Sequence, residues 1–497
     1  MTEPTIEQLL SQGIEHQRSG RTSQAEAVYR AILQRHPNST EAYERLGTLL
    51  LERGAFAEAA DSLRRAFDLD PSRTSALRNL CIALLRIDTT LMDPRGREIA
   101  RRYFERTADL PCTSADDWFI RALALIALEE PEQANLSCRE ALKLNPSFLP
   151  ARMNLGVTAN FLGRNNEALE AYRTVVEAQP ASAMAHVSYG MALLFAGQYL
   201  EGWQHYSWRW KAPPPSEQPR PYAQPIWRGQ EVNGKRVLLY SEQGFGDTIN
   251  FVRYAPLVAQ RGAKVIVQCP PALVNLLART PGIESVISEN DPLPPFDFHA
   301  PMMDLPMVFG TTLQTIPAQV PYLKCDPAKV ERWATRLAAD EPQGRPAMRI
   351  GLCWSGNPRR NQNRIRSIPL EMLSPLGALG PHMRFISLQK GFSTQNSSVS
   401  HWLTDYDDQL IDFDETTALM MHLDLIITVD TAIAHLAGAL ARPTWTMLCL
   451  GPDWRYMAAR ADIPWYPTMK LIRQTRWNDW TPVVEQIVHM LKALPES

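Results

Sequence analysis

The sequence predicts an all-α repeat solenoid followed by an α/β region that consists of two parallel-sheet domains. Two observations support this prediction. Small residues and prolines recur at intervals of 34 residues in the first 200 positions, and short apolar strands alternate with helices from about residue 235 onward. The organisation that follows is a solenoid over 1–211, a Pro- and Trp-rich connection over 212–230, α/β domains over 231–345 and 346–475, and a C-terminal helix over 476–497.

Composition excludes several classes of protein. The 497 residues include 51 Lys and Arg against 53 Asp and Glu, so a net charge of −2 argues against nucleic acid as a dominant partner. The N-terminus lacks the basic and apolar regions of a signal peptide, and no apolar run approaches the roughly 18 residues of a membrane span. The seven cysteines are odd in number and widely spaced, which favours reduced thiols. We therefore expect a cytoplasmic protein.

The repeats are visible as small residues and prolines at fixed positions. Three pairs in the first two copies are 34 residues apart: Gly13 and Gly47, Ala25 and Ala59, Pro37 and Pro71. Each copy has the pattern of two short amphipathic helices, with small residues where the helices approach and a proline that ends the second helix. The pattern resembles the tetratricopeptide repeat. Its copies cover 6–37, 40–71, 115–146, 149–180 and a partial one from 183.

Residues 72–114 depart from this period. We expect a degenerate repeat there, with a lengthened turn at "DTTLMDPRGREIARRYF". Because a helix pair cannot bury its own apolar face, the pairs stack into a curved array with a concave surface. Such a surface typically binds peptides or proteins. A purely structural or dimerising array is the alternative.

A Trp- and Pro-rich stretch follows the last repeat. Trp203, Trp208 and Trp210 precede six prolines between 213 and 225. The prolines favour an extended, stiff connection. We expect the large tryptophan side chains to pack the last repeat helix onto the next domain. A flexible tether is the alternative.

From residue 235 the spacing is that of βαβ units, and it restarts at 348. Strands are predicted at "KRVLLYSEQ", "AKVIVQCP" and "IESVI", and then at "MRIGLCWSGNP", "MRFISLQKG", "DLIITVD" and "PTWTMLCLG". Continuous helices are predicted at "DTINFVRYAPLVAQRG" and "LEMLSPLGAL", and a proline-rich loop region at 290–325. Two Rossmann-like domains arranged in this way leave a cleft at the carboxyl ends of their strands, where ligands bind.

Three motifs follow predicted strands. In the first, "SEQGFGD", Gly244 and Gly246 allow a sharp turn and close approach of a ligand. It is not a dinucleotide fingerprint, because Ile249 stands where the third glycine belongs. Asp247 has two interpretations: the N-cap of a helix, or a general base facing the cleft.

The second motif, "TVDTAIAHLAGA", places Asp430 and Thr431 between a buried strand and a helix, with His435 on the same helical face as Thr431. Unpaired N–H groups at a helix start suit a diphosphate. For His435, a satisfied buried histidine is the alternative to a ligand contact.

The third motif, "WSGNPRRNQNRIR", carries four arginines: Arg359, Arg360, Arg364 and Arg366. Cationic side chains at a strand end could offset the charge of a leaving diphosphate without a metal. A solvated surface is the alternative. The D-x-D sequences at 68–70, 405–407 and 412–414 are interpreted as helix or turn residues, and no metal is expected.

These stretches, together with "RSIPL", "FISLQKG" and "GPDWRYM", resemble bacterial two-domain (GT-B) glycosyltransferases of the heptosyltransferase type, glycosyltransferase family 9, and more closely the subgroup fused behind tetratricopeptide repeats. The order of repeats and GT-B domain is also similar to protein O-GlcNAc transferase. One departure is Pro256, which comes later than the Thr-Pro that usually follows the aspartate in heptosyltransferases. This departure argues against heptose as the donor sugar and lipopolysaccharide as the acceptor.

The resemblance implies a role for each motif. Asp247 matches the candidate catalytic base. The matches to donor-binding segments are Gly244, Gly246, Trp354, Ser355, Gly356, Asn357, Arg366, Gln389, Lys390, Asp430, Thr431 and His435.

The function implied is inverting, metal-independent transfer of a sugar from a nucleotide-sugar to an acceptor hydroxyl, with no cofactor, on a protein or peptide held by the repeats. A lipopolysaccharide or surface-glycan acceptor, and a non-catalytic scaffold, are the alternatives.

Overall fold

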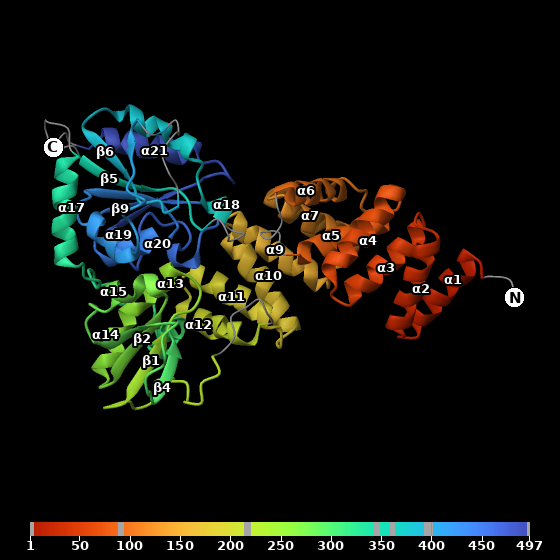
Figure 1. The fold of residues 1–497 in the computed structure, drawn as a ribbon, viewed down its shortest axis with the longest axis horizontal. Coiled ribbons are helices and arrows are strands. Elements are labelled where there is room, and N and C mark those ends of the chain that lie inside the picture. Colours follow the sequence, from red (N-terminus) through yellow and green to blue (C-terminus); the bar gives the residue numbers. More distant parts are fainter. Residues whose placement is uncertain are drawn as a thin grey trace. The chain divides into compact units, whose positions relative to one another are not determined.

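The computed structural model describes residues 4–87, 94–212, 220–340, 348–357, 363–391, 399 and 401–494. The chain divides into two compact units, Met1–Ala159 and Asn160–Ser497, and each is described by itself. The described residues of the first unit form antiparallel helix pairs (Figure 1). The second unit contains three further repeat helices, two parallel sheets and the helices that flank these sheets.

The helix pairs follow the 34-residue pattern. The helices of the first unit are α1 (Ile6–Arg18), α2 (Thr22–Arg35), α3 (Thr40–Glu52), α4 (Phe56–Leu69), α5 (Thr74–Arg86), α6 (Pro94–Ala108), α7 (Ala115–Ala127) and α8 (Pro131–Leu144), with α9 (Leu149–Phe161) crossing the boundary. Gly47 of α3 lies against Leu63 of α4, which is the close approach that the small residues predict. Pro37 and Pro71 each follow the end of a second helix.

The irregular stretch 72–114 is a helix pair as well. Helices α5 and α6 form it, and both bury apolar residues such as Leu77 and Phe104 in the core of the first unit. The predicted lengthened turn falls largely on residues 88–93, which lie outside the described residues.

Three repeat helices belong to the second unit: α10 (Asn165–Ala178), α11 (Ala183–Phe195) and α12 (Tyr199–Tyr206), followed by the 3₁₀ helix η2 (Ser207–Lys211). The packing boundary at 159/160 therefore differs from the end of the repeat pattern at 211. The physical reason is that α11 and α12 share one hydrophobic core with the α/β domains.

The three tryptophans at the end of the repeats do not all pack against the same part of the protein. Trp203 donates a hydrogen bond to the carbonyl of Thr311 at 2.9 Å, and Trp210 donates to Asp304 at 3.2 Å. Both therefore join the last repeat to the first α/β domain. Trp208 instead stacks on His186 of α11 with ring centroids 3.8 Å apart, which corrects the expectation that all three pack onto the next domain. Residues 213–219, with four of the six prolines, lie outside the described residues.

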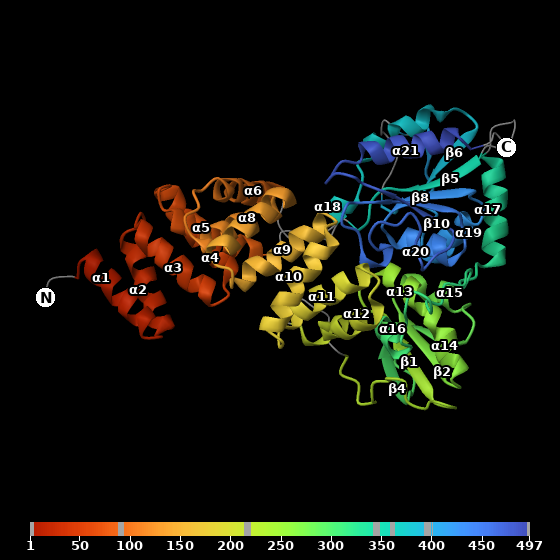
Figure 2. The same cartoon turned by 180° about the vertical axis from the view of Figure 1, so that it is seen from behind.

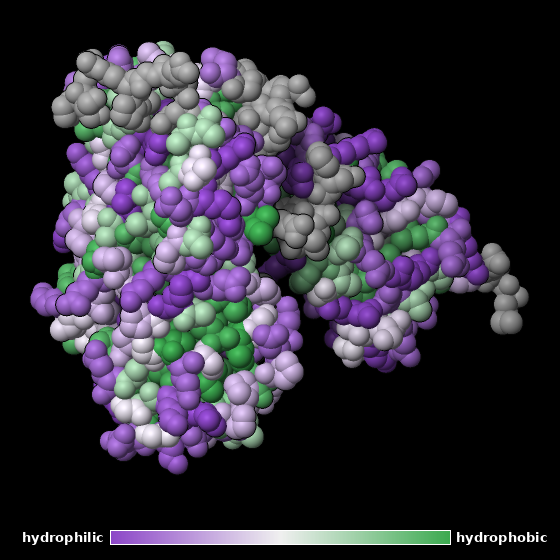
Figure 3. All heavy atoms as spheres, turned by 60° about the vertical axis from the view of Figure 1, so that its left-hand side comes forward, coloured by the Kyte–Doolittle hydropathy of each residue, from purple (hydrophilic) through white to green (hydrophobic). Residues whose placement is uncertain are grey.

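The first α/β domain has a four-stranded parallel sheet of order β3-β2-β1-β4. Its strands are β1 (Arg236–Tyr240), β2 (Lys264–Cys269), β3 (Ile283–Ser288) and β4 (Phe298–Pro301). The sequence missed β4, because this strand is short and lies among prolines. In the lower part of Figure 3, hydrophobic residues gather on one face of this domain, within a mostly hydrophilic surface.

The helices of this domain are shorter than predicted. They are α13 (Phe245–Phe251), η3 (Val252–Tyr254), α14 (Ala255–Gln260), η4 (Pro271–Leu273), α15 (Val274–Leu277), η5 (Met302–Asp304) and α16 (Leu305–Val308). The expected continuous helix over "DTINFVRYAPLVAQRG" is thus broken into three pieces. Pro256 enters at the start of α14, where its missing N–H breaks the ladder of helical hydrogen bonds.

The second α/β domain has a six-stranded parallel sheet of order β10-β9-β8-β5-β6-β7. Its strands are β5 (Met348–Cys353), β6 (Met383–Ser387), β7 (Leu403–Thr404), β8 (Leu425–Val429), β9 (Thr444–Leu448) and β10 (Met469–Arg473). The sequence predicted four of these strands and missed β7 and β10. The predicted boundary at 345/346 falls on 341–347, outside the described residues.

The helices of this domain are α17 (Pro327–Ala339), α18 (Asn363–Arg366), η6 (Leu370–Leu379), α19 (Phe413–Met420), α20 (Ala432–Ala439), η7 (Trp454–Tyr456) and α21 (Thr481–Lys492). The segment "LEMLSPLGAL" is a 3₁₀ helix, because Pro375 inside it cannot donate an α-helical hydrogen bond. Helix α17 lies before the predicted boundary at 345/346 but packs on α19 of this domain, where Arg332 and Trp333 both donate to Glu415.

The two α/β domains meet through α13 and α20, which lie side by side in Figures 1 and 2. Both helices follow the carboxyl end of a central strand, β1 in the first sheet and β8 in the second. The carboxyl edges of both sheets therefore face the same junction. The loops after the strands supply the candidate site there.

Candidate donor-binding and catalytic site

Most of the predicted site residues lie in loops or at helix starts that follow the carboxyl ends of four parallel strands, whereas Arg366 lies in α18 and His435 in α20. Residues 241–247 follow β1, 354–357 follow β5, 388–390 follow β6, and 430–431 follow β8. Because parallel strands end at a common edge, segments far apart in the sequence lie together. The contacts below show which side chains meet.

Asp247 is the third residue of α13, and Gly244 is the N-cap. This corrects the interpretation of Asp247 as the N-cap itself. One carboxylate oxygen, Oδ2, accepts a hydrogen bond from the backbone N–H of Gly244 at 2.9 Å. Gly244 has no side chain that could accept a hydrogen bond from the backbone N–H of Asp247. Only half of a capping box is therefore present. Asp247 nevertheless helps to start the helix.

The other carboxylate oxygen of Asp247 accepts a hydrogen bond from Arg455 of the second domain, at 2.5 Å. Arg455 also donates to Asp453 at 2.9 Å, and only 3% of its side chain is exposed. Burial by itself lowers the pKa of Arg455, but the carboxylates of Asp453 and Asp247 hold that pKa above its usual value. A buried, charged arginine therefore joins the candidate base to the second domain.

Gly246 brings the two helices into contact. A Cβ atom at this position would lie 2.7 Å from Cδ2 of His435, which is too close for any side chain other than hydrogen. Asp247 and His435 are thus on the same interdomain junction.

His435 is a satisfied, buried histidine, which was one of its two interpretations. Its Nδ1 lies 3.0 Å from the hydroxyl of Tyr466, and the residue is 6% exposed. Burial lowers its pKa well below the usual value, and the positive charge of Arg455 adds to this effect. The imidazole is therefore neutral at neutral pH. A contact with donor phosphate stays a prediction.

Thr431 caps α20, as the sequence indicates, with its hydroxyl accepting from the N–H of Ile433 at 3.3 Å. The neighbouring Asp430 accepts a hydrogen bond from the hydroxyl of Tyr456 at 3.1 Å and lies 3.9 Å from Arg366. Burial, together with the nearby Asp453, raises the pKa of Asp430 to about 6. This carboxylate is costly to ionise where it stands.

The loop after β5 joins the cluster through Gln389. The N–H of Ser355 donates to Oε1 of Gln389 at 2.9 Å, and Sγ of Cys353 lies 3.8 Å from the hydroxyl of Thr431. Gly356 is in close contact with the guanidinium of Arg366. The predicted donor-binding residues 355, 356, 366, 389, 430 and 431 therefore form one connected group.

The structure also shows the surroundings of Trp354 and Lys390. Trp354 is buried in the core of the second sheet, and its carbonyl accepts from Ile368 at 2.9 Å. Lys390 is paired with Asp407 at 3.1 Å, so the D-x-D sequence at 405–407 holds a lysine. Asn357 is the last described residue of its segment. Arg359 and Arg360 lie outside the described residues, and Arg364 is exposed.

Two guanidinium groups of the site each have an unsatisfied nitrogen. Nε of Arg366 and Nε of Arg455 are buried and have no hydrogen-bond partner among the described residues. Unpaired N–H donors are costly in a protein interior, and guanidinium groups bind phosphate well. Each guanidinium thus keeps one N–H donor that is unused within the described residues.

Sequence reasoning missed Asp453, Arg455 and Tyr456 as residues that contact the candidate site. All three lie in "GPDWRYM", a stretch that carries part of the family resemblance. A signal was available, because an aspartate and an arginine stand among aromatic residues directly after a strand. Only the tertiary structure shows their contacts, in which Arg455 joins Asp453 to Asp247 and Tyr456 donates to Asp430.

Two family models match parts of the chain. Residues 10–74 and 153–202 match the family model described as tetratricopeptide repeat. Residues 410–450, which include Asp430, Thr431 and His435, match the model of glycosyltransferase family 9 (heptosyltransferase). The protein is thus a tetratricopeptide-repeat array fused to a glycosyltransferase-like α/β region.

Among curated proteins, the chain is 27% identical over 389 residues to Protein FlbA of Caulobacter vibrioides, which covers 72% of this chain and 64% of that protein. Among solved structures, the crystal structure of YrrB, a TPR protein with an unusual peptide-binding site, is similar with 20% identity and a TM-score of 0.28, over 36% of this chain and 90% of that one. The thermophilic TPR protein TTC0263 of Thermus thermophilus is similar with 23% identity and a TM-score of 0.29, over 37% and 97% of the two chains.

Two kinds of feature are missing from the described residues. None of their helices combines the length and the apolar character that crossing a membrane requires. No group of three or more His, Cys, Asp and Glu side chains among them is placed to hold a metal ion.

Proposed function

We propose that this protein is an inverting, metal-independent glycosyltransferase that moves a sugar from a nucleotide-sugar to a hydroxyl group of a protein or peptide. The observation that carries the proposal is the junction of α13 and α20. It places the carboxylate of Asp247 beside Arg455, on the side where Thr431 caps its helix and Arg366 meets Asp430. We infer that the candidate base and a phosphate-binding group share one site.

In the proposed reaction the acceptor oxygen attacks the anomeric carbon while the bond from that carbon to the diphosphate oxygen breaks. Asp247 takes the proton of the acceptor hydroxyl. Its oxygens already accept from Gly244 and Arg455, but each carboxylate oxygen has a second lone pair available. The electron pair of the broken bond leaves with the diphosphate.

The departing diphosphate gains negative charge that the protein must stabilise. We assign this role to the N-terminus of α20 at Thr431 and to the unpaired Nε–H groups of Arg366 and Arg455. A neutral His435 would add a hydrogen bond rather than a charge. The family match over 410–450 supports this assignment, because it covers the strand and the helix that present Thr431.

The test is the exchange Asp247→Asn, which keeps the size of the side chain and an oxygen that can accept from Gly244. We expect sugar transfer to fall by about 10²- to 10⁴-fold, the usual contribution of a general base. Titration calorimetry with a panel of nucleoside diphosphates should show that nucleotide binding is retained. A nucleotide that binds only the native state should also raise the melting temperature.

Asp453→Asn is the matched control, since Asp453 accepts a hydrogen bond from the same arginine and has no part in the proposed proton transfer. Its transferase activity should fall much less than that of Asp247→Asn. Full activity of Asp247→Asn would remove the proposed base. A native protein that binds no nucleotide would favour the scaffold alternative.

A further inference from the structure

The last two repeats hold the loop that carries Arg455. The repeat turns at Gly163 and Gly197 are 34 residues apart and have the same left-handed backbone, with φ of 67° and 81°. A Cβ on Gly163 would lie 3.2 Å from the carbonyl oxygen of Leu450, and one on Gly197 would lie 2.9 Å from Cε of Met457. Two equivalent turns therefore contact the two ends of this loop.

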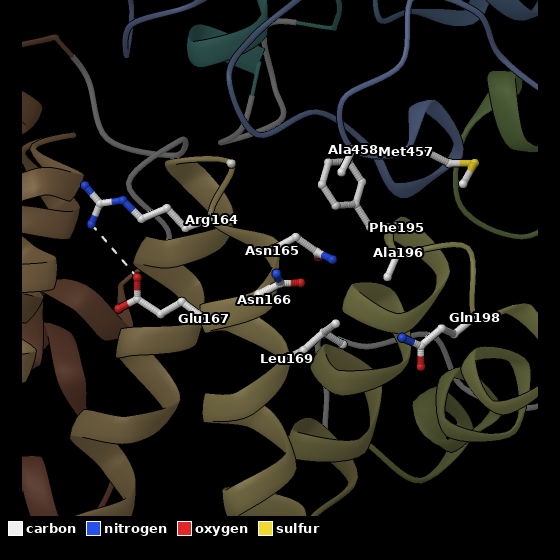
Figure 4. A pocket seen from close by; sticks show the side chains of 11 residues that line it. Arg164, Asn165, Asn166, Glu167, Leu169, Phe195, Ala196, Gln198, Met457 and Ala458 are labelled. Carbon is white, nitrogen blue, oxygen red and sulfur yellow. Dashed lines mark ion pairs between the residues drawn. The ribbon is translucent and has the colours of Figure 1, made fainter.

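A cavity of about 560 Å³ lies between these turns and the loop. It is lined by Gly163, Arg164, Asn165, Asn166, Glu167, Leu169, Phe195, Ala196, Gln198, Met457 and Ala458. Figure 4 shows that Asn165, Asn166 and Leu169 extend from α10 toward Phe195 and Ala196, with Met457 and Ala458 closing the upper side. Its size is within the usual range for ligand-binding pockets.

The lining is polar but nearly neutral. Three carboxamides, those of Asn165, Asn166 and Gln198, offer both hydrogen-bond donors and acceptors. The charged residues Arg164 and Glu167 form an ion pair with each other at 4.0 Å. Oδ1 of Asn165 is buried and finds no hydrogen-bond donor within the described parts of the chain. This lining suits a neutral ligand that carries both hydrogen-bond donors and acceptors.

The backbone of the closing loop is strained at the cavity. Met457 has φ of 53° with ψ of 169°, and Ala459 has φ of 50°. L-residues rarely adopt such conformations, and they concentrate at functional sites. The N–H of Ala458 donates to the carbonyl of Phe195 at 3.2 Å, so the repeat turn helps to hold the loop in this form. Met457 is two residues from Arg455, which pairs with Asp247.

We propose that this cavity binds an extended peptide segment of the acceptor. A peptide backbone supplies alternating N–H and C=O groups that match the carboxamides, and its side chains match the apolar wall of Leu169, Phe195 and Met457. The site differs from the concave surface expected for the repeats, since it is built from turns within the repeats. The description of the peptide as an acceptor rests on the proposed function.

The experiment uses the full chain and a library of fluorescein-labelled dodecapeptides of varied sequence, each with one serine or threonine. Fluorescence anisotropy measures binding to the native protein and to Asn165→Ala and Gln198→Ala. We expect a subset of peptides to bind, and each exchange to weaken that binding at least tenfold. Neither side chain makes a capping hydrogen bond to its helix, so the melting temperature should stay unchanged.

Gln204→Ala is the matched control, because Gln204 is an exposed amide of α12 that does not line the cavity. Its peptide affinity should equal that of the native protein. Three outcomes would overturn the proposal: no peptide binds the native protein, neither cavity variant changes the affinity, or the peptides are displaced by maltohexaose. Nucleotide binding is measured in parallel. A protein that binds nucleotide but no peptide contradicts only the peptide proposal, and a protein that binds peptide but no nucleotide contradicts only the proposed function.

Discussion

At the scale of single residues, the carboxylate of Asp247 performs two structural tasks at once. It accepts from the first turn of α13 through Gly244, and it pairs with Arg455 of the other α/β domain. The sequence presented helix start and chemistry as alternatives. The structure shows that the two oxygens of this carboxylate serve the helix start and an ion pair between the domains, and the role of Asp247 as a base stays a proposal.

Burial raises the pKa of the Asp430 carboxyl group. The pKa of its carboxyl is about 6 in the native state, against 3.8 in the unfolded chain, with burial as the main cause. The native state thus holds this proton more tightly than the unfolded state. Below pH 3.8 this proton makes its full contribution to the free energy of unfolding. That contribution is lost as the pH rises through 6.

Replacing Asp430 with Asn should therefore stabilise the protein in a pH-dependent way. The neutral amide keeps an oxygen for the hydroxyl of Tyr456 but has no charge to bury. We expect the stability advantage of the variant to grow from near zero at pH 4 to at most about 3 kcal/mol at pH 7.5. Melting temperatures of both proteins across this range measure it. An advantage that is constant with pH would show that Asp430 is not the titrating group.

At the scale of elements, the site depends on how closely two helices approach. Helix α13 of the first domain meets α20 of the second at Gly246 and His435. Both helices were expected from the sequence, and the start of α20 at Thr431 was expected correctly. The contact between the two helices was not expected, because the sequence of one segment does not indicate which other segment it packs against.

Gly246→Ala should push the two helices apart. Its added methyl group would stand 2.7 Å from the imidazole of His435, and overpacking of this kind costs about 1–3 kcal/mol. We expect a lower melting temperature and a reduced rate of sugar transfer.

The double variant Gly246→Ala, His435→Ala provides the control for this prediction. Removing the imidazole makes room for the methyl group, so the double variant should be more stable than the sum of the single effects indicates. Purely additive effects would show that the two residues do not touch in solution.

At the scale of the whole molecule, the last repeat helices are part of the glycosyltransferase-like unit. Arg209 of η2 donates to Glu242 and Asp304 of the first α/β domain at 2.9 and 2.6 Å, and the Glu242 side chain is only 2% exposed. Trp203 packs against Trp454 of the second domain with ring centroids 5.2 Å apart. The repeat helices thus contact both domains that form the site.

A fragment of residues 160–497 should therefore fold and bind nucleotide, whereas a fragment of 231–497 should not behave as a stable protein. The shorter fragment exposes Trp454 and leaves the buried carboxylate of Glu242 without Arg209, a loss worth about 3–5 kcal/mol. Thermal melts and light scattering of both fragments measure the difference. Equal melting temperatures would mean that the repeat helices contribute nothing to the α/β region.

The sequence by itself determined the periodic features of this protein. The 34-residue spacing of small residues and prolines predicted the helix pairs, and the alternation of apolar strands with helices predicted two parallel sheets. These are local patterns, since a period records which face of each element is buried. The motifs after β1, β5 and β8 were found for the same reason, because a polar loop directly after a buried strand is visible in a single segment.

Only the tertiary structure decided which of these segments meet. It paired Asp247 with Arg455, set Gly246 against His435, and turned Lys390 toward Asp407. It also joined the last repeats to the α/β domains through contacts between residues more than 200 positions apart, such as Trp465 and Tyr199. Such pairings depend on how whole domains pack, and packing is a property of the complete chain that no single stretch of sequence records.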